Sequence, residues 1–195
     1  EASEIYNFLI QNKVYDPRIL NNLGNIYSQS KQFDKAISLF NESINKFPKS
    51  LEAYTNLANI FVIKGKKDIA KRILNKTIEL DPKFLRTYSN LASIYVGEGN
   101  LEKAELFLRK SLEINSKDIN TIVNLACVLK DLGNPKQAEI FLREALEINP
   151  KFDFALINLG AILNELGNIH EGEELLRKAL VINPNSPMAL NNLGN

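Results

Sequence analysis

Histidine and cysteine are almost missing from this sequence, whose 195 residues include one of each, His170 and Cys127. A single cysteine excludes an internal disulfide framework and fits a reducing compartment. Catalysis and metal binding need several reactive groups that converge, whereas these two residues fall in different parts of the chain. We therefore expect no catalytic site, no metal and no cofactor, with His170 exposed to solvent and Cys127 acting as a small space-filling side chain.

An excess of charge of one sign and long apolar runs are also missing. Lysine and arginine number 24 against 23 aspartates and glutamates, so the net charge is +1, and both signs are mixed along the chain. This distribution lacks the basic surface that attracts nucleic acid or an anionic bilayer. No apolar stretch approaches the roughly 20 residues that span a membrane. We expect no nucleic-acid partner, no membrane partner and a cytoplasmic location.

What the sequence does contain is a repeat. The letters LNNLGN occupy residues 20–25 and again 190–195, five intervals of 34 residues later, with related copies at each intermediate interval. A fixed period of this length is typical of stacked supersecondary units. We expect one continuous solenoid, with the second helix of a preceding repeat at 1–16 and the start of a truncated sixth repeat at 187–195. The five full repeats are predicted at 17–50, 51–84, 85–118, 119–152 and 153–186.

Each repeat predicts two helices. Apolar residues recur at helical spacing in two stripes, as in Tyr88, Leu91, Ile94 and Tyr95 of one first stripe. The break between the stripes carries a glycine that can adopt positive φ. These glycines are Gly65, Gly99, Gly133 and Gly167, with Lys31 at the corresponding position of the first repeat. Because a helix pair cannot bury its apolar face alone, we expect an all-α, right-handed superhelical α-solenoid of helix-turn-helix repeats with a concave surface.

The spacing and the small residues at the helix contacts resemble the tetratricopeptide repeat family, including arrays found in bacterial scaffold proteins. Gly24 and Ala58 on first helices, and Ala36 and Ala70 on second helices, stand where the family has small residues. The resemblance covers nearly the whole chain and implies a non-catalytic scaffold that binds a protein or peptide in its concave groove. Because the sequence begins and ends inside a repeat, we expect a piece of a longer array whose exposed repeat ends self-associate or fray.

One asparagine recurs at the same place in all six first helices. These residues are Asn22, Asn56, Asn90, Asn124, Asn158 and Asn192. They match the asparagine ladder on the inner surface of the repeats of O-linked N-acetylglucosamine transferases, which this chain resembles and in which the ladder contacts substrate polypeptide backbones. A carboxamide has a donor and an acceptor that can pair with a peptide N–H and C=O. The resemblance therefore implies a peptide-binding asparagine ladder, whereas the alternative hypothesis gives these asparagines a role in contacts between helices.

Helical phase indicates which other side chains line the groove. Positions four before, one before and three after each ladder asparagine should face it. The predicted groove-lining residues are Arg18, Asn25, Asn59, Arg86, Phe154 and Ile157. They make the groove polar in the first repeats and apolar in the later ones, where an exposed apolar stretch indicates a contact surface. Two functions stay open, namely a protein-protein interaction scaffold and the substrate-recognition arm of a larger enzyme, such as a glycosyltransferase like the O-linked N-acetylglucosamine transferases.

Overall fold

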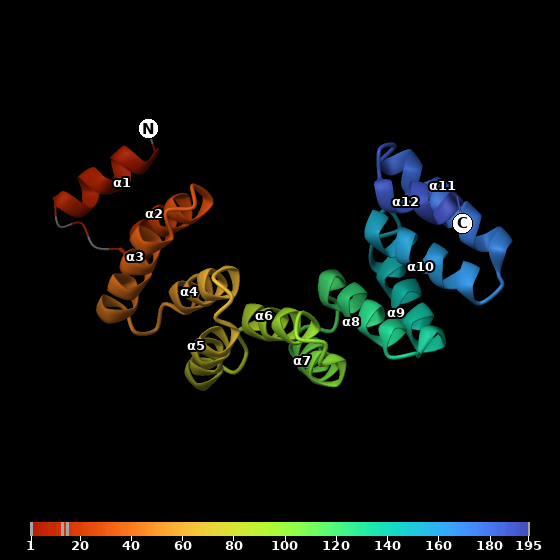
Figure 1. Cartoon of the computed structure of the whole chain (residues 1–195), viewed down its shortest axis with the longest axis horizontal. Coiled ribbons are helices and arrows are strands. Elements are labelled where there is room, and N and C mark those ends of the chain that lie inside the picture. Colours follow the sequence, from red (N-terminus) through yellow and green to blue (C-terminus); the bar gives the residue numbers. More distant parts are fainter. Residues whose placement is uncertain (1, 13, 15, 195) are drawn as a thin grey trace. The chain divides into compact units, whose positions relative to one another are not determined.

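The computed structural model describes residues 2–12, 14 and 16–194, and every regular element in these ranges is an α-helix (Figure 1). The helices are α1 (Ala2–Gln11), α2 (Pro17–Gln29), α3 (Phe33–Lys46), α4 (Leu51–Ile63), α5 (Lys67–Leu80), α6 (Leu85–Val96), α7 (Leu101–Ile114), α8 (Ile119–Asp131), α9 (Pro135–Ile148), α10 (Asp153–Glu165), α11 (Ile169–Ile182) and α12 (Pro187–Gly194). The all-α prediction is confirmed. Within the described ranges, no helix is both long and apolar enough to cross a membrane.

The chain forms two compact units, unit 1 (Glu1–Ile94) and unit 2 (Tyr95–Asn195), which we describe separately. Even-numbered helices are the first helices of repeats and odd-numbered helices are the second helices. The first helices begin at residues 17, 51 and 85 in unit 1 and at 119 and 153 in unit 2, so they follow the 34-residue period of the sequence. Each unit is therefore a helical repeat stack, as expected of a solenoid, whereas the right-handed superhelix stays a prediction.

The core of unit 1 is centred on α3, which packs against both α2 and α4. Phe40 of α3 and Ile60 of α4 are buried in it, together with Ala36 and Leu57. Gly24 of α2 lies against Phe40, and a Cβ atom at this glycine would come within 2.5 Å of the Phe40 ring. The missing side chain at residue 24 is thus what allows a phenylalanine to fill this part of the core.

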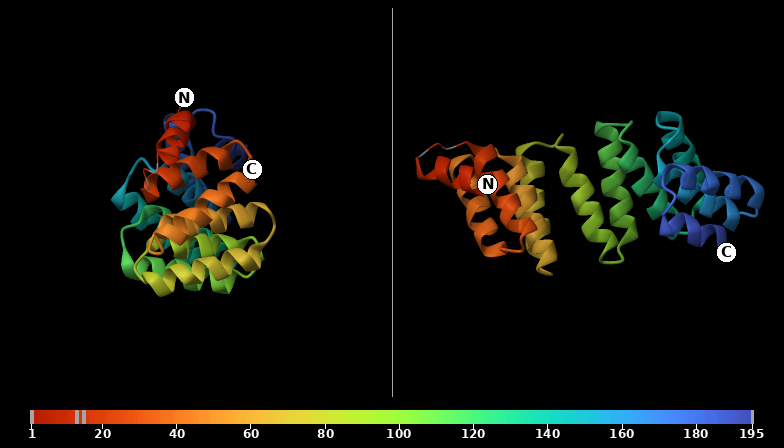
Figure 2. Two further views of the ribbon diagram at one scale, coloured as in Figure 1. Left: turned by 90° about the vertical axis from the view of Figure 1, so that its left-hand side faces the viewer. Right: turned by 90° about the horizontal axis from the view of Figure 1, so that it is seen from above.

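The core of unit 2 has the same plan with smaller side chains. Helix α10 packs between α9 and α11, and α12 packs against α10 and α11; Figure 2 shows the helices of unit 2 side by side. One buried cluster consists of Leu156, Ile157, Leu176, Ala179 and Ala189. These residues come from three consecutive helices, so one repeat is covered by the next.

The turns inside the repeats follow the predicted backbone conformation. Gly65, Gly99, Gly133 and Gly167 have φ angles between 73° and 86°, which confirms the prediction of positive φ. Lys31 has a φ of 59° and is the one non-glycine residue with positive φ in the described part of the chain. The first repeat therefore makes the same turn without glycine, at a steric cost that a β-carbon imposes.

Candidate functional site

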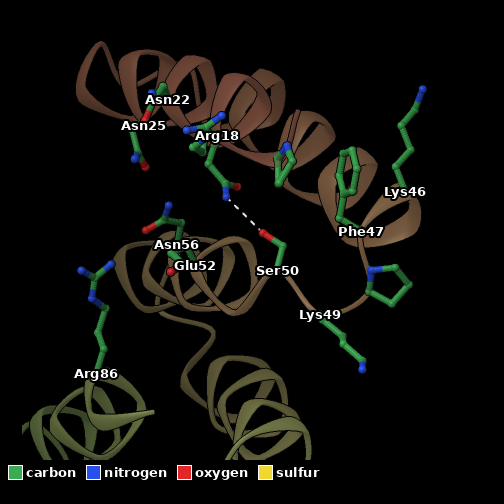
Figure 3. Close-up of a pocket in the computed structure, with 13 residues that line it drawn as sticks. Arg18, Asn22, Asn25, Lys46, Phe47, Lys49, Ser50, Glu52, Asn56 and Arg86 are labelled. Carbon is green, nitrogen blue, oxygen red and sulfur yellow. Dashed lines mark hydrogen bonds between the residues drawn. The ribbon is translucent and has the colours of Figure 1, made fainter. Parts of the chain in front are cut away.

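A groove lies between α2 and α4 in unit 1 and reaches the first turn of α6 (Figure 3). It has a volume of about 900 Å³. Asn25 of α2 and Asn56 of α4 face each other across it, and Arg86 extends from α6 toward Asn56. Its walls carry carboxamides and charged groups beside the apolar side chains of Pro17, Phe47 and Pro48.

The loop between α3 and α4 forms one end of this groove and is held against α2. Asn21 Nδ2 donates a hydrogen bond to Ser50 Oγ at 3.2 Å, drawn as a dashed line in Figure 3. Asn21 is 7% exposed, and its Oδ1 accepts no hydrogen bond from the described residues. Pro48 and Lys49 in the loop also line the groove. Asn21 is therefore part of the wall and fixes the loop in place.

The position directly before the ladder asparagine is buried in four repeats, whereas Ser89 is half-buried and Asn191 is exposed, and this corrects one prediction. Asn21, Thr55, Val123 and Ile157 occupy this position, and all four are buried. Ile157 is 2% exposed and packs with Leu176 of α11 and Ala189 of α12. The prediction that Ile157 lines a groove is wrong, because the next helices cover this side of α10.

The charges at the groove are only partly neutralised within the chain. Arg18 Nη2 lies 2.6 Å from Asp16 Oδ2, and hydrogen bonding from the Arg18 side chain lowers the pKa of the Asp16 carboxyl group. Arg86 and Glu52 also line the groove and are exposed. Neither forms a salt bridge with another residue that the structure describes. Arg86 and Glu52 are thus available for charges on a ligand.

The ladder asparagines are exposed or half-buried, but they differ in their hydrogen bonds. Asn22 Nδ2 donates to the Tyr6 hydroxyl at 3.1 Å, and Asn90 Nδ2 donates to Asn59 Oδ1 at 3.2 Å. Within the described ranges, Asn56 and Asn124 form no side-chain hydrogen bond. Asn59 takes part in this contact between repeats and is not among the residues that line the groove.

In unit 2 the ladder asparagine of α10 forms hydrogen bonds inside the protein. Asn158 Nδ2 donates to the Phe154 carbonyl oxygen at 2.7 Å, and Asn158 Oδ1 accepts from Cys127 Sγ at 3.5 Å. The Phe154 side chain is 52% exposed and lies next to Phe152, with ring centroids 6.1 Å apart. Asn192 is half-buried on α12, and its carbonyl oxygen accepts from Asn164 Nδ2 at 3.5 Å. At Asn158 the hypothesis of contacts between helices therefore has direct support.

The two reactive side chains, Cys127 and His170, belong to unit 2 and do not line the groove. Cys127 is half-buried, and burial, with a smaller contribution from Asp131, raises the pKa of its thiol, which disfavours the reactive thiolate. His170 is 91% exposed, with Nε2 3.7 Å from Glu174 Oε1. The described residues contain no group of three or more histidines, cysteines and carboxylates that could hold a metal ion.

Some groove residues were missed in the sequence. Glu52 lies four positions before Asn56, the same offset as Arg18 from Asn22, so this spacing would have identified it. Lys46, Phe47 and Lys49 lie at the end of α3 and in the following loop. These residues lie outside the first helices, so the helical phase of the first helices does not predict them.

Comparison with known proteins identifies the repeat. Profiles of the tetratricopeptide repeat match residues 17–50, 51–84, 85–151 and 155–183. YrrB, a tetratricopeptide repeat protein "with an unusual peptide-binding site", is 20% identical, with a TM-score of 0.70 over 99% of this chain and 100% of that one. Pseudomonas aeruginosa PilF is 16% identical, with a TM-score of 0.80 over 90% and 80% of the two chains. A thermophilic tetratricopeptide repeat protein of Thermus thermophilus, TTC0263, is 21% identical, with a TM-score of 0.71 over 92% and 98%. No curated protein sequence matches this chain at a significant level.

Proposed function

This chain belongs to the tetratricopeptide repeat family, and we propose that it binds an extended segment of a partner protein in the unit 1 groove, where Asn22 and Asn56 contact the peptide backbone. Members of the family are typically non-catalytic scaffolds for protein interactions. The finer proposal concerns the place and the manner of binding.

The proposal rests on the hydrogen bonding of the Asn56 side chain. Its carboxamide lines the groove opposite Asn25 and has no hydrogen-bond partner among the described residues. A free carboxamide can donate to a peptide carbonyl and accept from a peptide N–H whatever the side chains are. Asn22 keeps its Oδ1 free, because the bond to Tyr6 uses only Nδ2. Two amides on neighbouring first helices thus offer contacts one repeat apart.

Charge around these amides favours particular peptides. Arg86 and Glu52 lie on neighbouring first helices, α6 and α4, and both face the groove. We expect peptides with an acidic side chain near Arg86 and a basic one near Glu52 to bind more tightly than their charge-reversed counterparts. The peptide-binding site described for YrrB, which has the same fold, is consistent with a peptide ligand.

The proposal is tested by binding of a library of unstructured peptides to the wild type and to Asn22→Ala and Asn56→Ala. Each change removes about one hydrogen bond, worth about 1 kcal/mol, so affinity should fall roughly threefold to tenfold across many peptide sequences. Asn75→Ala is the matched control, because Asn75 is exposed on α5 and does not line the groove. Equal affinities for the wild type and the Asn56→Ala variant would exclude the backbone contact.

The second hypothesis, a substrate-recognition arm of a larger enzyme such as a glycosyltransferase, would use the same groove. The two hypotheses are distinguished by testing whether the native protein transfers a sugar from a nucleotide-sugar donor to a peptide that binds the groove. We favour the scaffold, because it requires only the carboxamides and charged groups of the groove.

A further inference from the structure

Unit 1 has a second groove, on a different face of α4. It lies between the second helices α3 and α5, with α4 as its floor, and has a volume of about 510 Å³. Tyr54, Leu57 and Phe61 of α4 line it. Viewed along the helix axis, these three residues lie about 100° to 160° away from Asn56, so they belong to a different face of α4. The two grooves have no lining residue in common.

The lining of this second groove is mostly apolar. Ile44 of α3, Ile73 of α5 and Phe61 of α4 are half-buried and pack on the core around Phe40 and Ile60. Ile69 of α5 is also half-buried at its edge. These side chains are fixed by the core on one side and accessible on the other. A ligand side chain would therefore meet a rigid apolar surface at little cost in ordering the protein.

In unit 2 an arginine covers the corresponding place. The residue equivalent to Asn41 of α3 is Arg109 of α7, and the residue equivalent to Ile73 is Phe141 of α9. The Arg109 guanidinium lies 5.9 Å from the centre of the Phe141 ring, and its Nε donates to Glu105 Oε1 at 2.7 Å. This side chain spans from α7 to α9, whereas Asn41 is too short to reach α5 in the same way.

In the next repeat of unit 2, an arginine again joins two neighbouring second helices. Arg143 of α9 is two repeats after Asn75 and three after Asn41, and its Nη1 lies 2.9 Å from Glu171 Oε1 on α11. Arginines thus join neighbouring second helices in unit 2. The α3–α5 groove has asparagine at the equivalent position, and its apolar lining stays open.

The rim of the open groove is basic. Arg72 and Lys76 are one turn apart on α5, and both line its edge. Lys76 Nζ is paired with Glu79 Oε2 at 2.7 Å, whereas Arg72 forms no salt bridge with any described residue. Asn41 on the opposite rim is uncharged. The ligand that complements this groove combines an apolar side chain with a carboxylate directed at Arg72.

We propose that the groove between α3 and α5 is a second docking site, which binds an amphipathic acidic segment of a partner protein through a leucine-like or phenylalanine-like anchor. The anchor packs on Ile44, Phe61 and Ile73, and an acidic neighbour pairs with Arg72. This site does not depend on the asparagines of the first groove. A scaffold with both sites could hold two segments of one partner or two different partners.

The test uses two pools of acetylated, amidated peptides of about 12 residues, long enough for three helical turns. One pool has Leu or Phe at two positions four apart and Asp or Glu beside them, and the other has Lys in place of the acids. Binding is followed by methyl NMR shifts of Ile44, Ile69 and Ile73. Acidic peptides should bind the wild type about tenfold more tightly than basic ones, which corresponds to about 1.4 kcal/mol.

Three variants separate this site from the rest of the molecule. Asn41→Arg places the unit 2 residue in unit 1 and should weaken binding of acidic peptides about tenfold, because the new arginine covers the anchor position. Arg72→Glu should reverse the preference between the two pools. Asn56→Ala should leave the Ile73 shifts unchanged even where it abolishes binding in the first groove.

The converse variant, Arg109→Asn, should uncover Phe141 and produce new shifts at Ile140 of α9. Asn41 and Arg109 lie on solvent-accessible faces, so circular dichroism should show that both variants keep the fold. The proposal is overturned if Asn41→Arg leaves the affinity unchanged, or if the pools bind equally. It is also overturned if sedimentation shows that the Ile73 shifts come from a second copy of this chain.

Discussion

Unit 1 and unit 2 are built on the same repeat, yet they fill equivalent positions with different side chains. In the repeats where the position before the ladder asparagine is buried, unit 1 has Asn21 and Thr55, whereas unit 2 has Val123 and Ile157. All four are buried, so the repeat accepts either a hydrogen-bonding or an apolar side chain there. On the second helices, unit 1 has Asn41 where unit 2 has Arg109 and Arg143.

The difference indicates which surfaces of the repeats are available for a ligand. In unit 2 the carboxamide of Asn158 and the arginines of α7 and α9 are engaged by the protein's own residues. In unit 1 Asn56, Arg86 and Arg72 line two grooves and form no hydrogen bond or salt bridge with the described residues, although Asn22 and Asn90 of unit 1 are bonded and Asn124 of unit 2 is not. The backbone period determines the stack, while the side chains decide which surface stays available for a ligand.

The largest effect is expected when a unit 1 side chain is placed in unit 2. Val123 is 5% exposed, and Phe152 stands where Ser50 hydrogen-bonds to Asn21 in unit 1. Val123→Asn therefore buries a carboxamide without that partner and loses apolar contact, so we expect a loss of about 3 kcal/mol in unfolding free energy. Native-state hydrogen exchange should show the loss in α8 and α9.

The reverse change, Asn21→Val, is the matched control. It removes the bond to Ser50, but it also removes the buried Oδ1 that accepts no hydrogen bond from described residues. The two effects oppose each other, so stability should change by less than about 1 kcal/mol. Equal losses for the two variants would contradict the claim that each unit is adapted to its own buried side chain.

A second contrast lies in how the helices of one repeat fit together. Unit 1 pairs Gly24 with Phe40, and unit 2 pairs Ala126 with Leu142 at the equivalent positions, with all of these residues buried. Gly24→Ala should destabilise unit 1 by about 2 kcal/mol, since its Cβ would overlap the Phe40 ring. Adding Phe40→Leu should restore most of this loss. A double-mutant cycle with a coupling energy near zero would show that the two positions are independent.

The sequence predicted the fold well because the fold is encoded locally. Apolar spacing identified the helices, and the glycines at 65, 99, 133 and 167 identified the turns. The site was predicted less well, because helical phase does not tell which side of a first helix the next repeat covers. The prediction that Ile157 lines the groove was wrong for that reason. The bond between Cys127 and Asn158, and the contact of Arg109 with Phe141, depend on residues about one repeat apart and have no signal in a single sequence.

A smaller effect is expected at the turn inside the repeat. Lys31 has a φ of 59°, whereas Gly133 of unit 2 has a φ of 80° at the equivalent position. Lys31→Gly should stabilise unit 1 by up to about 1 kcal/mol, because glycine adopts this conformation without the steric penalty of a β-carbon. Gly133→Lys should destabilise unit 2 by a similar amount, since open space around the Cβ leaves only the backbone penalty. Thermal unfolding of both variants should show shifts of opposite sign.

The smallest effect concerns the arginine that joins α9 to α11 in unit 2. Hydrogen bonding from Arg143 lowers the pKa of Glu171, so the contact contributes stability above the ordinary glutamate pKa, and this contribution is lost as the pH falls through the lowered value. Both side chains are more than 40% exposed, so Arg143→Gln should cost only about 0.5 kcal/mol at neutral pH. The difference from wild type should disappear once the pH is low enough to protonate the glutamate in both the folded and the unfolded state. Arg177→Gln is the control, because Arg177 pairs with Glu173 within α11 and joins no second helix. If both variants gave the same pH profile, the bridge between helices would contribute nothing beyond an ordinary surface pair, and its role in closing unit 2 would rest on Arg109 alone.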